Sequence, residues 1–368
     1  MKFAALKRMT LSAQRALYAR LPFVSEKMDD KQALTVMESC RPNMTKLPSP
    51  STMRPTTLDL SILIPAYNVA PFVEQCLQSV IHQTTSYSYE IIVVDDGSTD
   101  GTSAILDRYA GHGGSTVLHQ SNKGLACTRN RLLNEASGEY IMFVDADDVL
   151  PPNAIEALMR NTGNQKIDIV QGSYQNIRES GERISAEVSH FRGTCGTYAE
   201  RIRHLSGVCW GKVIRRSLFR CARFVENIVF EDTLLHFVIY ELCRSSIIIP
   251  DEVYQYRIVD NSITHTLNVD YKGIDTIYQV DALLKLRDEI GLPMNDDLYR
   301  MMLFQCGPIL FNRVRGYNTN ILRAAFIHCA HTINNLARDT DLDSNQQYLQ
   351  QAFQTFNYKL WKSASRVQ

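Results

Sequence analysis

Apolar runs of strand length alternate with helical patterns between residues 60 and 144, and this alternation limits the folds open to the chain. The runs cover residues 60–65, 90–94, 117–119 and 140–144. Helical spacing of apolar residues fills the intervals at 71–81, 102–109 and 125–136, and Gly138 is placed to end the last of these helices. Strand and helix in strict alternation are typical of a parallel sheet covered by helices on both faces. We therefore expect an α/β fold here.

Acidic residues directly follow the most apolar of these runs. Residues 140–144 suit a buried strand, and Asp145, Asp147 and Asp148 come at its carboxyl end. Open α/β sheets bind their ligands at that end of their strands. Hard cations such as Mg²⁺ take oxygen ligands, commonly one or two carboxylates together with substrate phosphates. The pattern indicates a metal and phosphate site. The alternative is an acidic loop that only caps the strand and the next helix.

The composition excludes several classes of protein. Lys and Arg number 39, as do Asp and Glu, so the formal net charge of +0 gives no field that would favour nucleic acid. The nine cysteines are scattered and contain no C-x-x-C pair, which argues against a disulfide framework or a zinc ribbon and indicates a reducing compartment. No apolar run approaches the ~18 residues of a spanning helix. Residues 1–23 make a poor secretory signal, so we expect a cytoplasmic protein.

The two ends of the chain differ from its α/β part. Residues 1–25 predict a basic amphipathic helix, which would lie on an anionic membrane surface, pack on the protein or be a loose terminus. Residues 29–58 carry four prolines among Ser and Thr and predict a linker. A hairpin is expected at 167–177 and 184–191, and from residue 270 the apolar spacing is helical. The tail aromatics are either internal or directed to a surface; they are Phe353, Phe356 and Trp361.

Four motifs within residues 59–162 carry a resemblance to a known family. They are Ile64-Pro65-Ala66-Tyr67-Asn68, Val94-Asp95-Asp96-Gly97-Ser98-Thr99-Asp100, Asn122-Lys123-Gly124 with Ala126-Cys127-Thr128-Arg129-Asn130, and Asp145-Ala146-Asp147-Asp148. Their order and approximate spacing resemble the nucleotide-sugar-binding half of family 2 glycosyltransferases, which are inverting enzymes. Trp210-Gly211-Lys212 and Phe230-Glu231-Asp232 extend the likeness to about residue 265. The resemblance implies a Rossmann-like GT-A fold, with a mostly parallel sheet, helices on both faces and a helical C-terminal extension.

The resemblance implies which residues would bind a nucleotide sugar. Tyr67 would stack near the base, and Asp96 would accept a uracil N–H, whereas Asp95 binds nucleotide or orients the turn. Arg129 sits in an apolar helix and would pair with the diphosphate, with Asp147, or structurally with another acid at the sheet end. The full predicted set is Pro65, Tyr67, Asp95, Asp96, Lys123, Arg129, Asp145 and Ala146.

The family pattern also implies a metal and a general base. Asp147 would bind Mn²⁺ or Mg²⁺ directly, and Asp145 would contact the ribose or the metal. His265 is either a further metal ligand or a structural histidine. Asp232 is the expected general base and Glu231 its reserve, although Asp232 could instead only cap the following helix.

Trp210 and Lys212 would line the acceptor site, and a core tryptophan is the alternative. These roles predict transfer of a sugar from a nucleoside-diphosphate sugar, a UDP-sugar by preference, to a hydroxyl of a cell-surface glycan or lipid-linked glycan. The products would be lipopolysaccharide, capsule or exopolysaccharide, made at the inner face of the cell membrane. Two alternatives stay open: a polyprenyl-phosphate sugar transferase, which Phe230-Glu231-Asp232 argues against, and a non-catalytic nucleotide-sugar-binding module. The expected domains are 1–58, 59–265, itself divided at 162, and 266–368.

Overall fold

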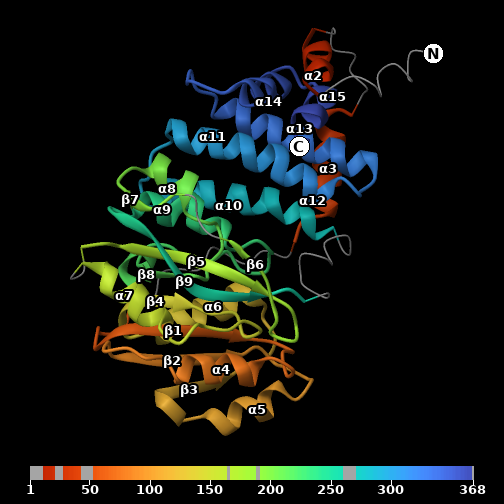
Figure 1. Cartoon of the computed structure of the whole chain (residues 1–368). Helices are drawn as coiled ribbons and strands as arrows, with labels where there is room; N and C mark the ends of the chain where they lie inside the picture. The colour runs from red at the N-terminus through yellow and green to blue at the C-terminus, as the bar shows by residue number, and fades with distance from the viewer. Residues whose placement is uncertain are drawn as a thin grey trace. The chain divides into compact units, whose positions relative to one another are not determined.

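The chain divides into two compact units. The computed structural model describes residues 11–20, 28–42, 53–163, 166–187, 191–259 and 271–366. The α/β unit consists of Thr45–Asn227 and Glu231–Ser262, and the helical unit consists of Met1–Met44, Ile228–Phe230 and Ile263–Gln368. Figure 1 shows both, with the chain coloured from its N-terminus to its C-terminus. Whether 1–58, 59–265 and 266–368 are separate domains stays a prediction.

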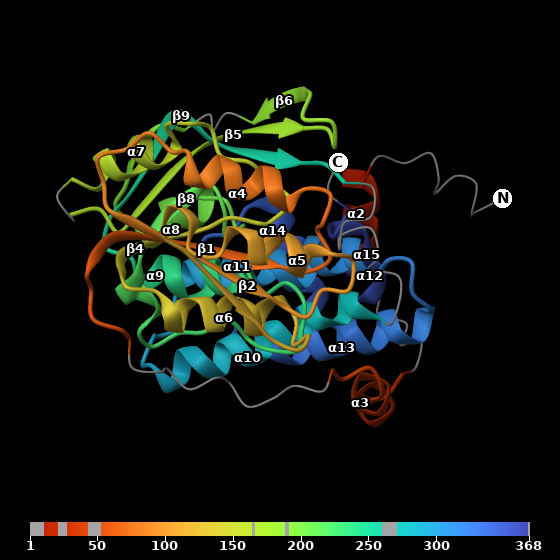
Figure 2. The ribbon, with the colours of Figure 1, turned by 90° about the horizontal axis from the view of Figure 1, so that it is seen from below.

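Parallel strands form one half of the sheet in the α/β unit. They are β1 (Leu58–Ala66), β2 (Tyr89–Asp95), β3 (Ser115–His119) and β4 (Gly138–Phe143), in the order β3-β2-β1-β4. Helices α4 (Val73–Ile81), α5 (Thr102–Tyr109) and α6 (Leu125–Glu135) connect them. The predicted alternation of strand and helix is confirmed. Figure 2 shows α4 and α6 on opposite sides of β1 and β2.

Gly138 was assigned the wrong role by the sequence pattern. It is the first residue of β4 and does not end the preceding helix. A Cβ atom at this position would lie 2.4 Å from the backbone nitrogen of Ser61 on β1. The glycine therefore permits close approach of two strands.

The other half of the sheet is mixed. Strand β8 (Lys212–Arg215) pairs antiparallel with β4. Across the sheet, the next strands after β8 are β5 (Ile169–Ile177), β9 (Ser246–Arg257) and β7 (Gly193–Cys195). With β6 (Arg183–Glu187), which pairs with β5, the sheet has nine strands in the described part of the chain. The β5–β6 hairpin is confirmed. The remaining helices are α7 (Ala154–Met159), α8 (Tyr198–His204), the π-helical η4 (Leu235–Ile239), α9 (Tyr240–Leu242) and the short η1 (His112–Gly114), η2 (Arg160–Thr162) and η3 (Arg216–Phe219).

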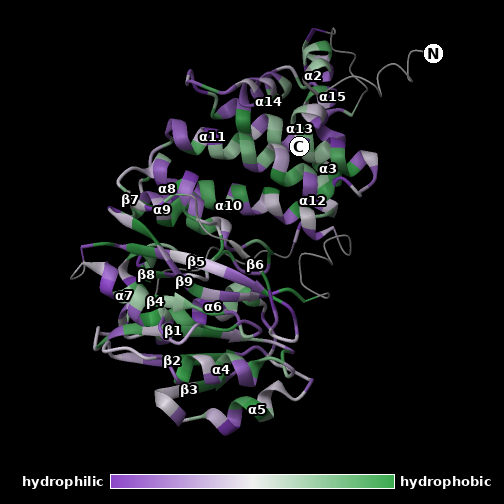
Figure 3. Ribbon diagram, in the orientation of Figure 1, coloured by the Kyte–Doolittle hydropathy of each residue, from purple (hydrophilic) through white to green (hydrophobic). Residues whose placement is uncertain are grey.

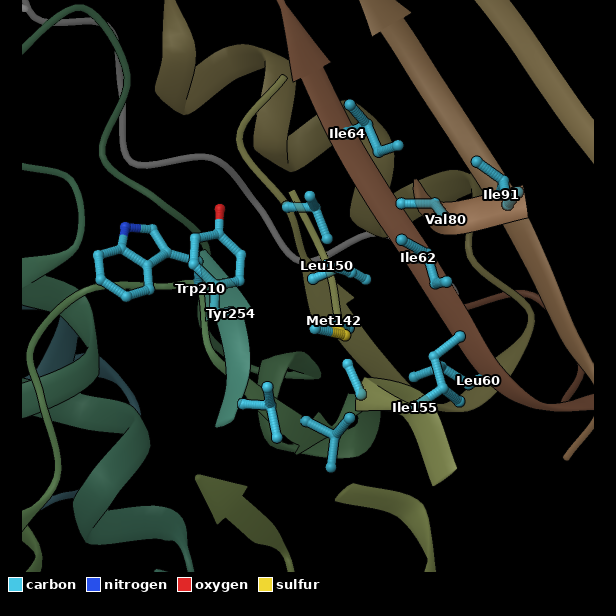
Figure 4. Close-up of a cluster of buried hydrophobic side chains, with 14 of the residues drawn as sticks. Leu60, Ile62, Ile64, Val80, Ile91, Met142, Leu150, Ile155, Trp210 and Tyr254 are labelled. Carbon is cyan, nitrogen blue, oxygen red and sulfur yellow. The ribbon is translucent and has the colours of Figure 1, made fainter. Parts of the chain in front are cut away.

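One apolar cluster of the α/β unit lies on one face of β1 and β4. Leu60, Ile62 and Ile64 alternate along β1 toward this face and contact apolar residues of α4 and α7. Figure 4 shows this cluster, in which Trp210 and Tyr254 lie together. Each such side chain, when fully buried, contributes about 1.5–3 kcal/mol. This packing fixes where the carboxyl ends of the strands lie.

The helical unit contains helices from both ends of the chain. They are α2 (Leu11–Arg20), α3 (Asp30–Ser39), η6 (Lys272–Ile274), α10 (Asp275–Glu289), α11 (Asp296–Phe304), η7 (Gln305–Ile309), α12 (Leu310–Val314), α13 (Thr319–Asn335), α14 (Ser344–Gln354) and α15 (Tyr358–Ala364). Polar and apolar colours alternate along α10 and α13 in Figure 3, as expected for amphipathic helices. The predicted helical tail is confirmed.

The N-terminal helices pack on this unit. Arg15 of α2 donates to the carbonyls of Ser363 (3.3 Å) and Arg366 (2.9 Å), so residues 11–20 pack on the protein. The linker predicted from residue 29 was wrong for α3. Asp29 and Gln32 form a capping box that starts this helix, and its Met37 is buried.

The tail aromatics Phe353 and Trp361 are 0% exposed, so the interpretation as core residues holds for these two. Phe356 is partly exposed.

Candidate active site

Asp95 organises the turn that follows β2. Its carboxylate accepts the Ser98 N–H (3.0 Å) and the Ser103 hydroxyl (2.5 Å), and lies 2.9 Å from His119 Nδ1. Burial alone would raise the pKa of Asp95, but the hydrogen bonds from Ser103, Ser98 and His119 lower it below its ordinary value. In this structure the Asp95 carboxylate therefore bonds to other residues of the protein and stabilises the turn.

Asp96 holds the loop that leads into α6. It accepts the backbone N–H groups of Lys123 (2.8 Å) and Gly124 (2.8 Å) and the Gln120 side-chain amide (2.7 Å). Asp96 is 4% exposed, whereas Lys123 is exposed. The expected contact of Asp96 with a base stays a prediction, and the structure adds a role in shaping the loop.

Tyr67 lies just past the end of β1. Its ring is 48% exposed, whereas Pro65, within the strand, is buried. The next residue, Asn68, takes a left-handed φ of 51°, and its side-chain oxygen accepts the Thr99 N–H (2.8 Å). This bond ties the end of β1 to the turn after β2 and leaves the tyrosine ring open to solvent.

The four residues 145–148, here called the acid loop, are built on a buried scaffold. Asp148 accepts the Tyr254 hydroxyl (2.7 Å) and the Arg257 N–H (2.7 Å), and the Asp145 N–H donates to the same tyrosine oxygen (3.1 Å). Ala146 is 3% exposed and belongs to the apolar core, so its side chain faces inward. Any contact of Ala146 with a ligand would have to use its backbone.

The negative charge of Asp147 is unfavourable in its surroundings. Burial first, and then the Asp145 carboxylate, raise the pKa of Asp147 to about 6. Burial and the two neighbouring carboxylates also raise the pKa of Asp148. A bound cation would relieve this repulsion, because an opposite charge within a few ångströms favours the ionised form. The acid loop therefore fits a hard divalent metal.

Protein side chains alone do not complete such a metal site. Within the residues that the structure describes, no group of three or more His, Cys, Asp or Glu side chains is arranged to hold a metal ion. Mg²⁺ and similar ions are commonly held by one or two carboxylates and by substrate phosphates, which Asp145 and Asp147 suit. His265, the other predicted ligand, lies outside the described residues.

Arg129 joins two of the predicted motifs. Its guanidinium donates to Asp145 Oδ1 (2.9 Å) through one nitrogen and forms an ion pair with Glu231 through another. The side chain is 4% exposed and lies over the rings of Phe143 and Phe224. Burial would lower the pKa of Arg129, but the surrounding negative charges raise it. The alternative of a structural pair with a sheet-end acid is the one observed. A diphosphate contact stays a prediction.

Glu231 and Asp232 differ in their surroundings. Glu231 is 7% exposed and paired with Arg129, and burial raises its pKa more than the arginine lowers it. Asp232 is partly exposed, and its carbonyl accepts the Leu235 N–H (2.9 Å) at the start of the helix. Of the two acids, Asp232 is therefore the more accessible to a substrate.

Lys212 does not face a ligand in this structure. Its ammonium donates to the carbonyl (2.6 Å) and hydroxyl (3.0 Å) of Ser206 and to the Tyr240 hydroxyl (2.9 Å), which uses all three N–H groups. The residue is 0% exposed, and burial lowers the pKa of Lys212 to about 7. This geometry favours a structural role over the predicted contact with an acceptor.

Trp210 is 9% exposed and stacks face to face with Tyr254, at 4.6 Å between ring centroids, and with Tyr256, at 5.2 Å. Figure 4 shows the Trp210 and Tyr254 rings together. Since the Tyr254 hydroxyl accepts the Asp145 N–H, Trp210 packs against a residue that holds the acid loop. The interpretation as a core tryptophan agrees with this packing.

Arg257 is a positioning residue that sequence reasoning missed. It is 2% exposed and donates to the carbonyls of Asp147 (2.7 Å) and Glu179 (2.7 Å) and to the Gln75 side chain (2.6 Å). It thus links the acid loop to the β5–β6 turn and to α4. The only signal in the sequence is an arginine at the end of an aromatic strand, which is too common to single out.

The chain is similar to known glycosyltransferases. The model of the family "Glycosyl transferase family 2" matches residues 61–222. Glycosyltransferase GlyG of Streptococcus pneumoniae is 31% identical over 221 residues, which make up 56% of this chain and 73% of GlyG. Glycosyltransferase GlyA of the same organism is 30% identical over 263 residues, or 66% of this chain, but the chain spans only 37% of GlyA.

Solved structures share the fold. The crystal structure of S. aureus TarS 1–349 has a TM-score of 0.59 at 19% identity and covers 83% of this chain and 90% of its own. The complex of TarS 1–349 with UDP-GlcNAc has a TM-score of 0.54 at 18% identity, with the same coverage. In the described part of the chain, no helix has the length and apolar character needed to cross a membrane.

The resemblance predicted from the sequence is confirmed by these matches. The likeness to GlyG extends over almost three quarters of that protein, and the chain shares its overall fold with TarS 1–349. This chain accordingly belongs to glycosyltransferase family 2 and is a GT-A-type sugar transferase.

Proposed function

We propose that this glycosyltransferase moves a sugar from a UDP-sugar to an acceptor hydroxyl with inversion at the anomeric carbon. The observation that carries the proposal is the pair of bonds from Arg129 to Asp145 and Glu231. They hold the acid loop, the proposed site of the diphosphate, close to the acids proposed for deprotonation. The existence of TarS complexes with UDP and with UDP-GlcNAc supports a uridine donor.

Tyr67 and Asp96 are the proposed contacts of the base. Tyr67 offers an exposed ring at the strand end, and stacking on an aromatic ring is worth about 1–3 kcal/mol per base. Asp96 is 4% exposed and its neighbour Asp95 is 1% exposed, so Asp96 would have to become more accessible to contact uracil. The exposed Lys123, whose N–H donates to Asp96 from the loop before α6, is proposed to approach the phosphates.

Asp147 is the proposed ligand of a divalent metal, with Asp145 as a second contact. When bound, Mn²⁺ or Mg²⁺ would supply positive charge to the departing diphosphate. Arg129 holds the Asp145 carboxylate, and Arg257 holds the backbone carbonyl of Asp147. The Asp145 carboxylate and the backbone of the loop are thus held by the protein itself, which favours a preorganised site.

Asp232 is the proposed general base. The acceptor oxygen attacks the anomeric carbon as the bond to the diphosphate oxygen breaks, its electron pair leaves with UDP, and the acceptor proton passes to the Asp232 carboxylate. A single displacement inverts the configuration. Glu231 is less suited to the proton transfer because it is buried against Arg129, so we assign it a positioning role.

The proposed acceptor is a hydroxyl of a cell-surface or lipid-linked glycan, reached at the cytoplasmic face of the membrane. The choice of acceptor rests on family resemblance, because the two residues expected to line the acceptor site, Trp210 and Lys212, are packed inside the unit. A polyprenyl phosphate acceptor would need no base, and the accessible Asp232 favours a hydroxyl over it. A nucleotide-sugar-binding module without catalysis differs from the proposed enzyme in turnover alone.

Release of UDP from a panel of UDP-sugars tests the proposal, with GDP- and dTDP-sugars as the comparison and Mn²⁺ present. We expect turnover of a UDP-sugar, and Asp232→Asn should lower kcat by about 100-fold or more with little change in donor KM, because general bases contribute about 10²–10⁴. Asp107→Asn, which makes the same change on the surface of α5, is the matched control. Binding of UDP-sugars without any turnover would favour the non-catalytic module, and an Asp232→Asn variant as active as the wild type would exclude Asp232 as the base.

A further inference from the structure

Asn130 follows Arg129 on α6 and holds a distant part of the α/β unit. The residue is buried, and its side-chain oxygen accepts the Phe224 N–H (3.0 Å). Its side-chain nitrogen donates to the Phe224 carbonyl (2.9 Å) and to Glu226 Oε1 (2.9 Å), so both N–H groups of the amide are used. Because the amide contacts both backbone groups of Phe224, it fixes the position and the direction of the chain at this residue.

The ring of Phe224 packs against the guanidinium of Arg129. The ring is buried and meets Phe143 edge to face, at 5.7 Å between ring centroids. The guanidinium carbon of Arg129 lies 5.6 Å from the centroid of Phe143 and 5.9 Å from that of Phe224. The face of an aromatic ring attracts a cation, and more strongly where water is excluded. A shift of Phe224 would therefore displace the guanidinium.

The orientation of the Arg129 guanidinium depends on few contacts. Its two terminal nitrogens pair with Asp145 and Glu231, whereas Nε has no hydrogen-bond partner among the residues that the structure describes. The two acids and the rings of Phe143 and Phe224 thus determine how the group lies. A tilt of the guanidinium would loosen both ion pairs together.

We propose that Asn130 is a positioning residue for sugar transfer, which acts by fixing Phe224 against Arg129. The arginine then keeps the acid loop and Glu231 in the arrangement that the reaction requires. This inference rests on the proposed function, in which the acid loop contacts the donor and its metal, and Asp232, next to Glu231, is the base. The role requires no contact between Asn130 and the substrate.

The variant Asn130→Asp separates the two kinds of hydrogen bond. A carboxylate still accepts the Phe224 N–H, but it cannot donate to the Phe224 carbonyl, and it faces the Glu226 carboxylate. Adding Glu226→Gln to this variant removes the repulsion and supplies an N–H donor for the new carboxylate. The double variant therefore restores one of the two lost hydrogen bonds, with donor and acceptor exchanged.

The measurement is kcat for UDP release by the full chain, at saturating donor and Mn²⁺, with thermal melts of the same samples. Asn130→Asp should lower kcat by about tenfold to 100-fold, the scale of a misplaced catalytic group. The double variant should regain at least about fivefold, because side chains in direct contact couple on this scale. Asn161→Asp, which also removes an amide donation to a backbone carbonyl (Ala157, 2.8 Å), is the matched control and should keep the wild-type kcat.

A second variant, Phe224→Leu, tests the role if Asn130→Asp does not fold. Leucine keeps the backbone hydrogen bonds to Asn130 and removes the ring from the guanidinium. We expect kcat to fall about tenfold, the size of a shielded cation–π contact. A wild-type kcat in folded Phe224→Leu would overturn the positioning role.

The other outcomes separate this inference from the proposed function. A wild-type kcat in folded Asn130→Asp, while Asp232→Asn is inactive, would overturn the positioning role and leave the proposed base in place. So would a lower unfolding midpoint without a lower kcat, because Asn130 would then only stabilise the unit. A loss of kcat that Glu226→Gln does not partly recover would also overturn it, because the loss would not pass through this contact. If the wild type turned over no donor, the proposed function would fall, and this inference with it.

Discussion

The two acidic turns of the α/β unit look alike in sequence and differ in electrostatics. Both follow a buried parallel strand, β2 in one case and β4 in the other. In the first turn, Asp95 and Asp96 accept hydrogen bonds from neighbouring loop residues, and the pKa of Asp95 is lowered. In the second, the pKa values of Asp147 and Asp148 are raised by burial and mutual repulsion.

This difference separates a structural acid from a ligand-binding one. Carboxylates whose lone pairs are filled by the protein stabilise a fold, whereas carboxylates that repel each other at a partly exposed position destabilise it until a cation arrives. The first turn should thus matter mainly for stability, and the second mainly for activity. Substitutions at Asp147, Asp96 and His119 test that contrast.

The largest effect is expected for Asp147→Ala. Metal-dependent UDP release should fall on the order of 100- to 1,000-fold, the size seen when one contact to a developing charge is removed. The midpoint of thermal unfolding should stay the same or rise, because a repelled carboxylate is lost. Kinetics and a thermal melt of the same sample measure both. A large loss of stability would erase the contrast between the turns.

A smaller effect, on stability, is expected for Asp96→Ala. The N–H groups of Lys123 and Gly124 would lose their acceptor, and each buried unsatisfied group costs about 1–3 kcal/mol. Urea denaturation should show a loss of about 3 kcal/mol, and a smaller one for Asp96→Asn, which keeps one acceptor oxygen. Unfolding free energies equal to that of wild type would mean that the loop does not depend on Asp96.

The smallest effect concerns the pH dependence of the first turn. The hydrogen bond to Asp95 raises the pKa of His119 above its ordinary value of 6.5. A raised histidine pKa contributes stability that is complete below pH 6.5 and is lost as pH rises through the folded-state value. Because His119 is 44% exposed, screening limits the effect to about 1 kcal/mol or less.

Unfolding free energies of wild type and His119→Phe, measured from pH 5 to pH 9, would show this contribution as a steeper decline in the wild type. Asp95 acts in the opposite direction, since its lowered pKa gives stability that is lost as pH falls below 3.8. Parallel curves for the two proteins would show that the imidazole contributes nothing to the turn.

The local elements could largely be predicted from the sequence. The alternation of strand and helix predicts β1 to β4 because side-chain periodicity and strand length are local properties. The motifs in that region also suffice to indicate the family. The helix α3 was missed because prolines nearby suggested a linker, although Asp29 and Gln32 carry the capping box that starts it.

The roles of individual site residues depended on contacts across the chain. The α/β alternation, the acids at the strand ends and the family can be read from the residues in order along the chain. The fold was needed to show that Lys212 and Trp210 are packed inside and that Arg129 joins Asp145 to Glu231. Each of these depends on which distant side chain meets a buried polar group. Burial makes such partners obligatory, but spacing along one chain does not identify them.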